Sequence, residues 1–275
     1  MNAAAPHSAV HVALDVGAGP TALCLHGNPD TGVLFAPLAA RLGKQMRLVA
    51  PDLPGFGGSP WPVWFDRRGD GGPTFDDRTL DAMAAWTDCA ITQIAPDGPV
   101  HLILHDFGGP FGLAWAIRHP ERVGRIALLN TFFSPTMRWH FWARVWRTPV
   151  LGELAVALAT RGFFRLEMRR GSRHLERAHI DAVHARVTRQ ARRAVLRLYR
   201  ATDPAIFAPW MADLQRLTAD RPTCVLWGMH DPYLTPDLAE AFGATDVAFL
   251  RDCGHWSPVE KVDDVAIKLA DFFAD

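Results

Sequence analysis

The chain alternates short apolar runs with longer stretches in which apolar residues recur at helical spacing. Apolar runs of about five residues are typical of strands that a parallel sheet buries on both faces. The longer stretches are typical of helices that pack one face against such a sheet. The predicted strands are Thr21–Leu25, Met46–Ala50, Val100–Leu104, Arg125–Leu129, Thr223–Trp227 and Val247–Leu250.

Helical spacing follows several of these strands, at Thr79–Ile94, from Pro110 onward and at Val262–Phe273. Alternating strands and helices favour an α/β fold with a doubly wound, mostly parallel sheet. Ligands of such folds bind at the carboxyl ends of the strands. The glycines within Trp61–Pro73 predict a loop there.

The pattern changes between residues 132 and 203, where strand-like runs disappear. Helices are predicted at Trp139–Trp146, Glu153–Phe164 and Ala178–Tyr199. We therefore expect a helical lid of residues 132–203, inserted into a core formed by residues 1–131 and 204–275.

The expected lid is strongly basic, because residues 131–200 contain 15 arginines and only four acidic residues. One interpretation is that this charge attracts an anionic substrate or product. The other is an ordinary solvated helix surface, in which arginine serves as a good helix former. We favour the second, because most charged helix faces are simply solvated.

Composition indicates an ordinary enzyme-sized domain of 275 residues with a formal net charge of zero. Zero charge argues against general nucleic-acid binding, and no apolar run approaches membrane-spanning length. The opening MNAAAPHSAV lacks the features of a signal peptide, and four dispersed cysteines show no zinc-like spacing. We expect a cytoplasmic protein whose partner is a small-molecule substrate, without nucleic acid or membrane, and leave a homodimer open.

The chemistry centres on the stretch VHLILHDFGGPFGLAWAIRHP, residues 100–120. A strand ends at Asp106, Gly108 and Gly109 allow a sharp turn, and a helix follows. The residue at such an apex is held beside the free N–H groups of the helix. Serine is usual there, in the pattern G-x-S-x-G. Asp106 is already ionised at neutral pH and needs no base to attack carbon, although an isolated Asp could simply cap the helix.

Two further residues reverse that simpler interpretation. Asp231 follows the predicted strand Thr223–Trp227, and His255 follows Val247–Leu250. The order nucleophile, acid, histidine, with each residue just beyond a strand, is the order found in hydrolases with a nucleophile elbow.

From HGNP at His26 to GHW at Gly254, the chain resembles the aspartate-nucleophile group of α/β-hydrolases. That group contains epoxide hydrolases and haloalkane dehalogenases. The resemblance implies that Asp106 attacks substrate to form an alkyl ester, that His255 activates water, and that Asp231 orients His255. It implies no cofactor and no metal.

The resemblance also implies the stabilising groups around the nucleophile. The backbone N–H groups of Asn28 and Phe107 would form the oxyanion hole. In some relatives the acid follows the strand before the lid, but Asn130 stands at that position here. Asp231 is therefore the expected acid.

The leaving group separates the possible functions. Tyr199, in LRLYR, resembles the lid tyrosine that protonates the epoxide oxygen in epoxide hydrolases. Against this, Asn28 resembles the halide-binding asparagine of dehalogenases, and the second tyrosine usual in epoxide-hydrolase lids is missing. Phe107 offers no side-chain N–H where dehalogenases carry tryptophan. Other lid residues could supply an N–H or simply pack in the core: Trp139, His140, Trp142 and Trp146.

These observations predict an epoxide hydrolase that produces a vicinal diol, with haloalkane dehalogenase as the alternative. Decarboxylases of β-lactones share HGNP and the Asp nucleophile, and form a third hypothesis. A non-catalytic receptor on the same fold is a fourth, and the complete set of Asp106, Asp231 and His255 speaks against it.

Overall fold

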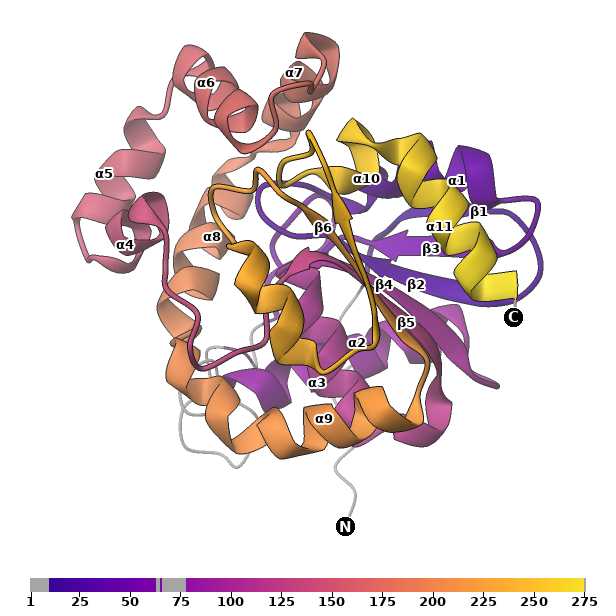
Figure 1. The fold of residues 1–275 in the computed structure, drawn as a ribbon. Helices are drawn as coiled ribbons and strands as arrows, with labels where there is room; N and C mark the ends of the chain where they lie inside the picture. Colours follow the sequence, from indigo (N-terminus) through magenta and orange to yellow (C-terminus); the bar gives the residue numbers. More distant parts are fainter. Residues whose placement is uncertain (1–9, 63–64, 66–77, 275) are drawn as a thin grey trace.

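A computed structural model describes residues 10–62, 65 and 78–274 of the chain (Figure 1). Most of the opening MNAAAPHSAV lies outside the described residues, at 1–9. The loop expected at Trp61–Pro73 also lies largely outside them, at 63–64 and 66–77.

Seven strands form one sheet in the order β1-β3-β2-β4-β5-β6-β7. Among the strands of the described residues, β1 alone pairs antiparallel with its neighbour, and the other pairings are parallel. This confirms the predicted α/β class with a mostly parallel sheet. The strands are β1 (Val12–Val16), β2 (Thr21–Leu25), β3 (Arg47–Pro51), β4 (Val100–Asp106), β5 (Val123–Thr131), β6 (Thr223–Gly228) and β7 (Asp246–Leu250).

Helices cover both faces of the sheet (Figure 1). Alternate residues of a strand point to opposite faces, so Leu23 packs in one core layer and Cys24 in the other, both fully buried. One layer contains α1 (Ala36–Leu42) and α11 (Val262–Ala274); the other contains α2 (Thr79–Ile94), α3 (Gly108–Arg118) and α9 (Met211–Asp220). Shorter helices are η1 (Gly32–Phe35), η3 (Pro120–Arg122), η4 (Pro204–Trp210), η5 (Pro236–Phe242) and α10 (Ser257–Glu260).

Between β5 and η4, the described chain forms five α-helices, and we call them the inserted helices. They gather to one side of the sheet, with α4 to α7 farthest from it (Figure 1). Their position agrees with the expected lid, whereas the boundaries at 132 and 203 stay a prediction. The inserted helices are α4 (Phe141–Arg147), α5 (Leu151–Leu158), α6 (Arg161–Gly171), α7 (Arg177–Arg186) and α8 (Arg189–Ala201).

Two of the three predicted lid helices were wrong, because each is broken into two. The Thr160 hydroxyl accepts a hydrogen bond from the Phe163 N–H (3.2 Å) and starts α6. The Thr188 hydroxyl accepts from the Ala191 N–H (3.1 Å) and starts α8. A threonine that satisfies a free N–H at a helix start is a strong N-cap, and here it outweighs the continuous apolar spacing.

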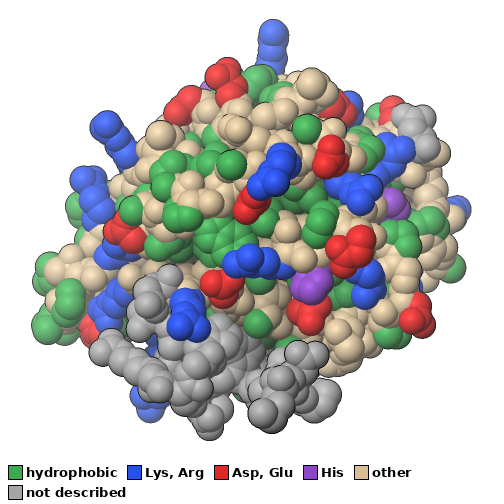
Figure 2. Space-filling model, turned by 90° about the horizontal axis from the view of Figure 1, so that it is seen from below, with side chains coloured by type: hydrophobic (Ala, Val, Ile, Leu, Met, Phe, Trp, Pro, Cys, Tyr) green, Lys and Arg blue, Asp and Glu red, His purple; other side chains and the backbone are tan. Residues whose placement is uncertain are grey.

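Charge is mixed on the face of the molecule seen from below, where basic and acidic side chains are interspersed (Figure 2). This distribution agrees with the zero net charge of the chain. In the described part of the chain, no helix combines the length and the apolar character needed to cross a membrane.

Candidate active site

The turn from β4 into α3 places Asp106 at its apex, with a left-handed backbone (φ 49°). Such a conformation is unfavourable for a non-glycine residue and persists only where neighbours enforce it. Two glycines make room for the turn. A Cβ on Gly108 would lie 2.1 Å from the Leu25 carbonyl oxygen, and one on Gly27 would lie 1.9 Å from Asp106 Oδ1. Strand β2 and helix α3 therefore hold the carboxyl group in a narrow space.

The Asp106 carboxylate is almost completely buried, with 6% of the residue exposed. The Asn28 backbone N–H donates to Oδ1 at 2.8 Å. Burial raises the pKa of the Asp106 carboxyl, while His255 and the backbone N–H groups of Phe107 and Asn28 oppose the rise. The two N–H groups expected from the sequence thus point at this carboxyl group.

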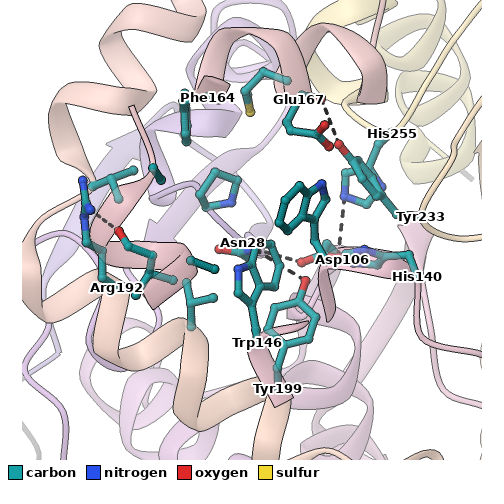
Figure 3. Close-up of a pocket in the computed structure, with 18 of the residues that line it drawn as sticks. Asn28, Asp106, His140, Trp146, Phe164, Glu167, Arg192, Tyr199, Tyr233 and His255 are labelled. Atoms are coloured by element: carbon teal, nitrogen blue, oxygen red, sulfur yellow. Dashed lines mark hydrogen bonds and ion pairs between the residues drawn. The ribbon is translucent and has the colours of Figure 1, made fainter. Parts of the chain in front are cut away.

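His255 lies between two carboxylates. Its Nδ1 is 2.7 Å from Asp231 Oδ2. Its Nε2 is 3.6 Å from Asp106 Oδ2 (Figure 3). Burial lowers the pKa of His255, but Asp231 and Asp106 together outweigh burial and raise it. A hydrogen bond from Nδ1–H to Asp231 leaves Nε2 as the proton acceptor on the side of Asp106.

Several hydrogen-bond donors surround the Asp231 side chain. Its Oδ1 accepts hydrogen bonds from the backbone N–H groups of Tyr233 (2.8 Å) and Leu234 (3.1 Å). Its Oδ2 also accepts from Asn130 Nδ2 at 2.9 Å. Asn130, at the end of β5, therefore supports the acid. Asp252 is a poor alternative, because its side chain is 81% exposed and lies near His230.

Tyr199 approaches the same place from α8. Asn28 Nδ2 donates a long hydrogen bond to Tyr199 Oη (3.5 Å), and the hydroxyl points toward Asp106 (Figure 3). The ring packs against Phe107 and Trp146, each with ring centroids 4.9 Å away. Burial and, after it, the Asp106 charge raise the pKa of Tyr199 well above its usual value. The hydroxyl therefore keeps its proton.

Comparison with known proteins settles the family. The alpha/beta hydrolase fold profile matches residues 20–262. The chain belongs to this family. The hydrolase is 29% identical over 255 residues to a cis-3-alkyl-4-alkyloxetan-2-one decarboxylase of Xanthomonas campestris pv. campestris, covering 86% of the chain and 83% of that protein. It is 28% identical over 277 residues to haloalkane dehalogenase 2 of Mycobacterium tuberculosis, covering 94% and 90%.

Solved structures share the fold at lower sequence identity. The hydrolase is similar to potato (Solanum tuberosum) epoxide hydrolase I, with a TM-score of 0.76 and 18% identity over 94% of each chain. Likeness at that identity concerns the fold alone. The chain spans nearly the full length of all three proteins.

The four aromatic lid candidates all line the cavity above Asp106, but they differ in what they offer. Trp139 Nε1–H donates to the Thr202 carbonyl (3.2 Å), which favours the packing alternative for this residue. His140 Nδ1 accepts from the Ala143 N–H (3.3 Å), and burial lowers the pKa of His140 to about 4. Its proton is therefore on Nε2, and the ring is neutral. The buried indole N–H of Trp142 has no hydrogen-bond partner among the described residues, and the Trp146 ring packs on Tyr199.

Four residues around the site were not identified from the sequence. Tyr233 packs edge-on against His255 at 5.3 Å and donates its hydroxyl to the Glu167 carbonyl at 2.9 Å. Trp256 Nε1 donates to Asp30 Oδ2 at 2.7 Å, and burial raises the pKa of Asp30 to about 7. Asp30 directly follows HGNP and Trp256 is the last residue of GHW, which is the sequence signal that could have pointed to them.

The cavity of the hydrolase has a volume of about 1100 Å³, including its open mouth. It extends from Asp106 and His255 outward between α5, α6 and α8, and its walls are mainly apolar. Within the part of the chain that the structure describes, no three His, Cys, Asp or Glu side chains gather as a metal site.

Proposed function

We propose that the hydrolase is an epoxide hydrolase that acts through an ester on Asp106. The observation that carries this proposal is the buried, protonated Tyr199 hydroxyl directed at Asp106. An epoxide oxygen leaves as an alkoxide and needs a proton, and a positioned acid of this kind supplies one. A halide needs none.

In the first step, an Asp106 oxygen attacks an epoxide carbon and the carbon–oxygen bond of the ring breaks. Tyr199 gives its proton to the ring oxygen, which becomes a hydroxyl group. The product of this step is a hydroxyalkyl ester of Asp106, with Tyr199 as the phenolate.

In the second step, His255 Nε2 takes a proton from water while the water oxygen attacks the ester carbonyl carbon of Asp106. The oxyanion lies between the N–H groups of Asn28 and Phe107. On collapse, the leaving alkoxide takes up the remaining proton of the water, which gives the vicinal diol and restores the Asp106 carboxylate. The proton on His255 passes back to Tyr199. Asp231 stabilises the imidazolium that forms in between.

Ester formation also prepares the base. The Asp106 charge is one cause of the raised pKa of His255, and esterification removes that charge. His255 is therefore more readily neutral in the ester than in the free enzyme, at the moment when a base is required.

Haloalkane dehalogenase is the second candidate, favoured by the Asn28 side chain beside Asp106 and by the relative of that activity. In that reaction Asn28 Nδ2 stabilises the departing halide, and Tyr199 transfers no proton. The later hydrolysis of the ester is the same.

One experiment with several arms tests both candidates. A His255→Gln protein should form the ester and fail to hydrolyse it, so mass spectrometry should find Asp106 heavier by the substrate. In that background, Tyr199→Phe should slow ester formation from an epoxide by about 10²–10⁴-fold, while Asn28→Ala has the smaller effect. Asp106→Ala is the control that should acquire no mass.

The outcomes are distinct. Ester formation from a 1-haloalkane that tolerates Tyr199→Phe and collapses with Asn28→Ala would favour the dehalogenase. An unmodified Asp106 with a substrate that the unaltered enzyme turns over would disprove the ester mechanism.

A further inference from the structure

Arg192 lines the cavity at the end opposite to Asp106 (Figure 3). One of its guanidinium nitrogens, Nη1, donates to the Val156 carbonyl near the end of α5. Among the described residues, no carboxylate forms an ion pair with it. An arginine has five N–H donors, so the Val156 contact leaves most of them available.

Arg192 lies on the same face of α8 as the residue proposed to donate the proton. Arg192, Val195 and Tyr199 are three and four residues apart and all line the cavity, as the helical period requires. Seven residues of α-helix rise about 10 Å. The cationic end of the cavity is therefore separated from the reacting end by roughly the length of a medium alkyl chain.

The wall between these two ends is apolar. Burying an alkyl or aryl chain there is favourable by about 25 cal/mol for each Å² removed from water. A hydrophilic substrate would gain nothing from this surface. The wall is formed by Ala155, Val156, Ala159, Phe163, Phe164 and Val195.

The two ends of the cavity carry opposite charge. Asp106 and Glu167 line the inner part, with Asp231 behind His255, and these carboxylates repel an anionic group. At the outer end, His184 has its pKa lowered by burial and by the positive charges of Arg161 and Arg192. His184 is thus neutral, and Arg192 supplies the charge.

We propose that Arg192 binds a carboxylate at the far end of an apolar substrate whose reactive carbon lies at Asp106. This inference rests on the proposed function for the reacting group, an epoxide. The inference adds the chemical character of the remainder of the substrate. This remainder is an unbranched or aromatic apolar chain that ends in a carboxylate, as in an epoxidised medium-chain fatty acid. Arginine can hold such a carboxylate through two parallel hydrogen bonds.

Equilibrium binding tests this inference without any turnover. Calorimetry compares octanoate with octanamide, which has the same chain and no charge. The unaltered enzyme should bind octanoate at least about 10-fold more tightly, as expected for hydrogen bonds between charged groups. Arg192→Gln should bind both equally, and Arg192→Lys should restore part of the preference.

Arg193→Gln is the matched control, since Arg193 is the next residue of α8 and is exposed. It should retain the full preference for octanoate. Thermal unfolding of each variant shows whether loss of the Val156 contact disturbs the fold, and Arg192→Lys separates charge from packing.

A second arm measures kcat/KM for a terminal epoxide with a distal carboxylate and for its methyl ester. No preference for octanoate, or a preference that survives Arg192→Gln, would overturn the carboxylate assignment and leave epoxide chemistry intact. A preference that depends on Arg192, together with no turnover of either epoxide, would instead refute the proposed reaction.

Discussion

That Asp106, His255 and Asp231 lie together could be predicted from the sequence, because each stands at or soon after the end of a strand. Parallel strands bring their carboxyl ends to one edge, so position in the chain implies proximity. Tyr233 and Asp30 carried no such signal. Their place beside His255 depends on contacts with Glu167 and Trp256, which only the packed molecule brings together.

Asp231→Asn should lower turnover by about 10⁴-fold. The amide would donate toward His255 Nδ1 and favour the tautomer with its proton on Nε2, where a base cannot accept one. Steady-state kinetics measures the loss. Asp252→Asn is the control, because the Asp252 side chain is 81% exposed. A larger loss of turnover in Asp252→Asn than in Asp231→Asn would show that the orienting acid was assigned wrongly.

Asp30 should make the free energy of unfolding depend on pH. Burial raises its pKa in the folded protein from 3.8 to about 7, so the folded state holds this proton more tightly than the unfolded state. Asp30 therefore makes the free energy of unfolding decline as the pH rises between these two pKa values. Asp30→Asn should make this decline shallower by a few kcal/mol between about pH 4 and pH 7.

Denaturant unfolding at several pH values measures the Asp30 effect as a difference between variant and unaltered protein. Asp237→Asn, at an exposed position on η5, is the control and should leave the pH dependence unchanged. Parallel curves for Asp30→Asn and the unaltered enzyme would contradict the prediction.

At the scale of elements, apolar runs were sufficient for six of the seven strands, because central parallel strands are buried on both faces. The remaining strand, β1, is an edge strand whose residues are all at least partly exposed, so it has no such run. Helix α2 matches its predicted bounds, whereas the breaks at Thr160 and Thr188 depend on single hydroxyl caps.

Gly108→Ala tests the contact between α3 and β2 that forms the elbow. The added Cβ would lie 2.1 Å from the Leu25 carbonyl oxygen. Relief of this contact requires α3 or β2 to move. The free energy of unfolding should fall by about 1–3 kcal/mol, and turnover should fall further because Asp106 moves with the turn. Gly162→Ala on α6, where a Cβ meets nothing closer than 4.0 Å, should preserve both stability and turnover. Unchanged turnover in Gly108→Ala would show that the elbow tolerates displacement.

At the scale of the whole molecule, the zero net charge conceals a separation of charge. Residues 131–200 hold 15 of the 29 basic residues and only four of the 29 acidic ones. Several of these arginines are neutralised in ion pairs, including Arg165 with Asp181 and Arg200 with Glu153. The solvated-surface interpretation suits those, but it does not account for Arg192, whose guanidinium lines the cavity. If Arg192 binds a carboxylate as proposed, the arginine excess combines two functions, and the sequence alone could not separate them.

This separation predicts that ionic strength distinguishes anionic from neutral substrates. The inserted helices carry this excess positive charge and also line the cavity, and a positive field raises the rate at which an anion arrives. The Debye length falls from about 10 Å at 0.1 M salt to about 3 Å at 1 M, which screens the field beyond direct contact. For an epoxide with a distal carboxylate, kcat/KM should fall several-fold over that range, while the methyl ester of the same compound should change little. The ester corrects for effects of salt on the enzyme itself, and an equal decline for both compounds would show that the charge of the inserted helices plays no part in attracting substrate.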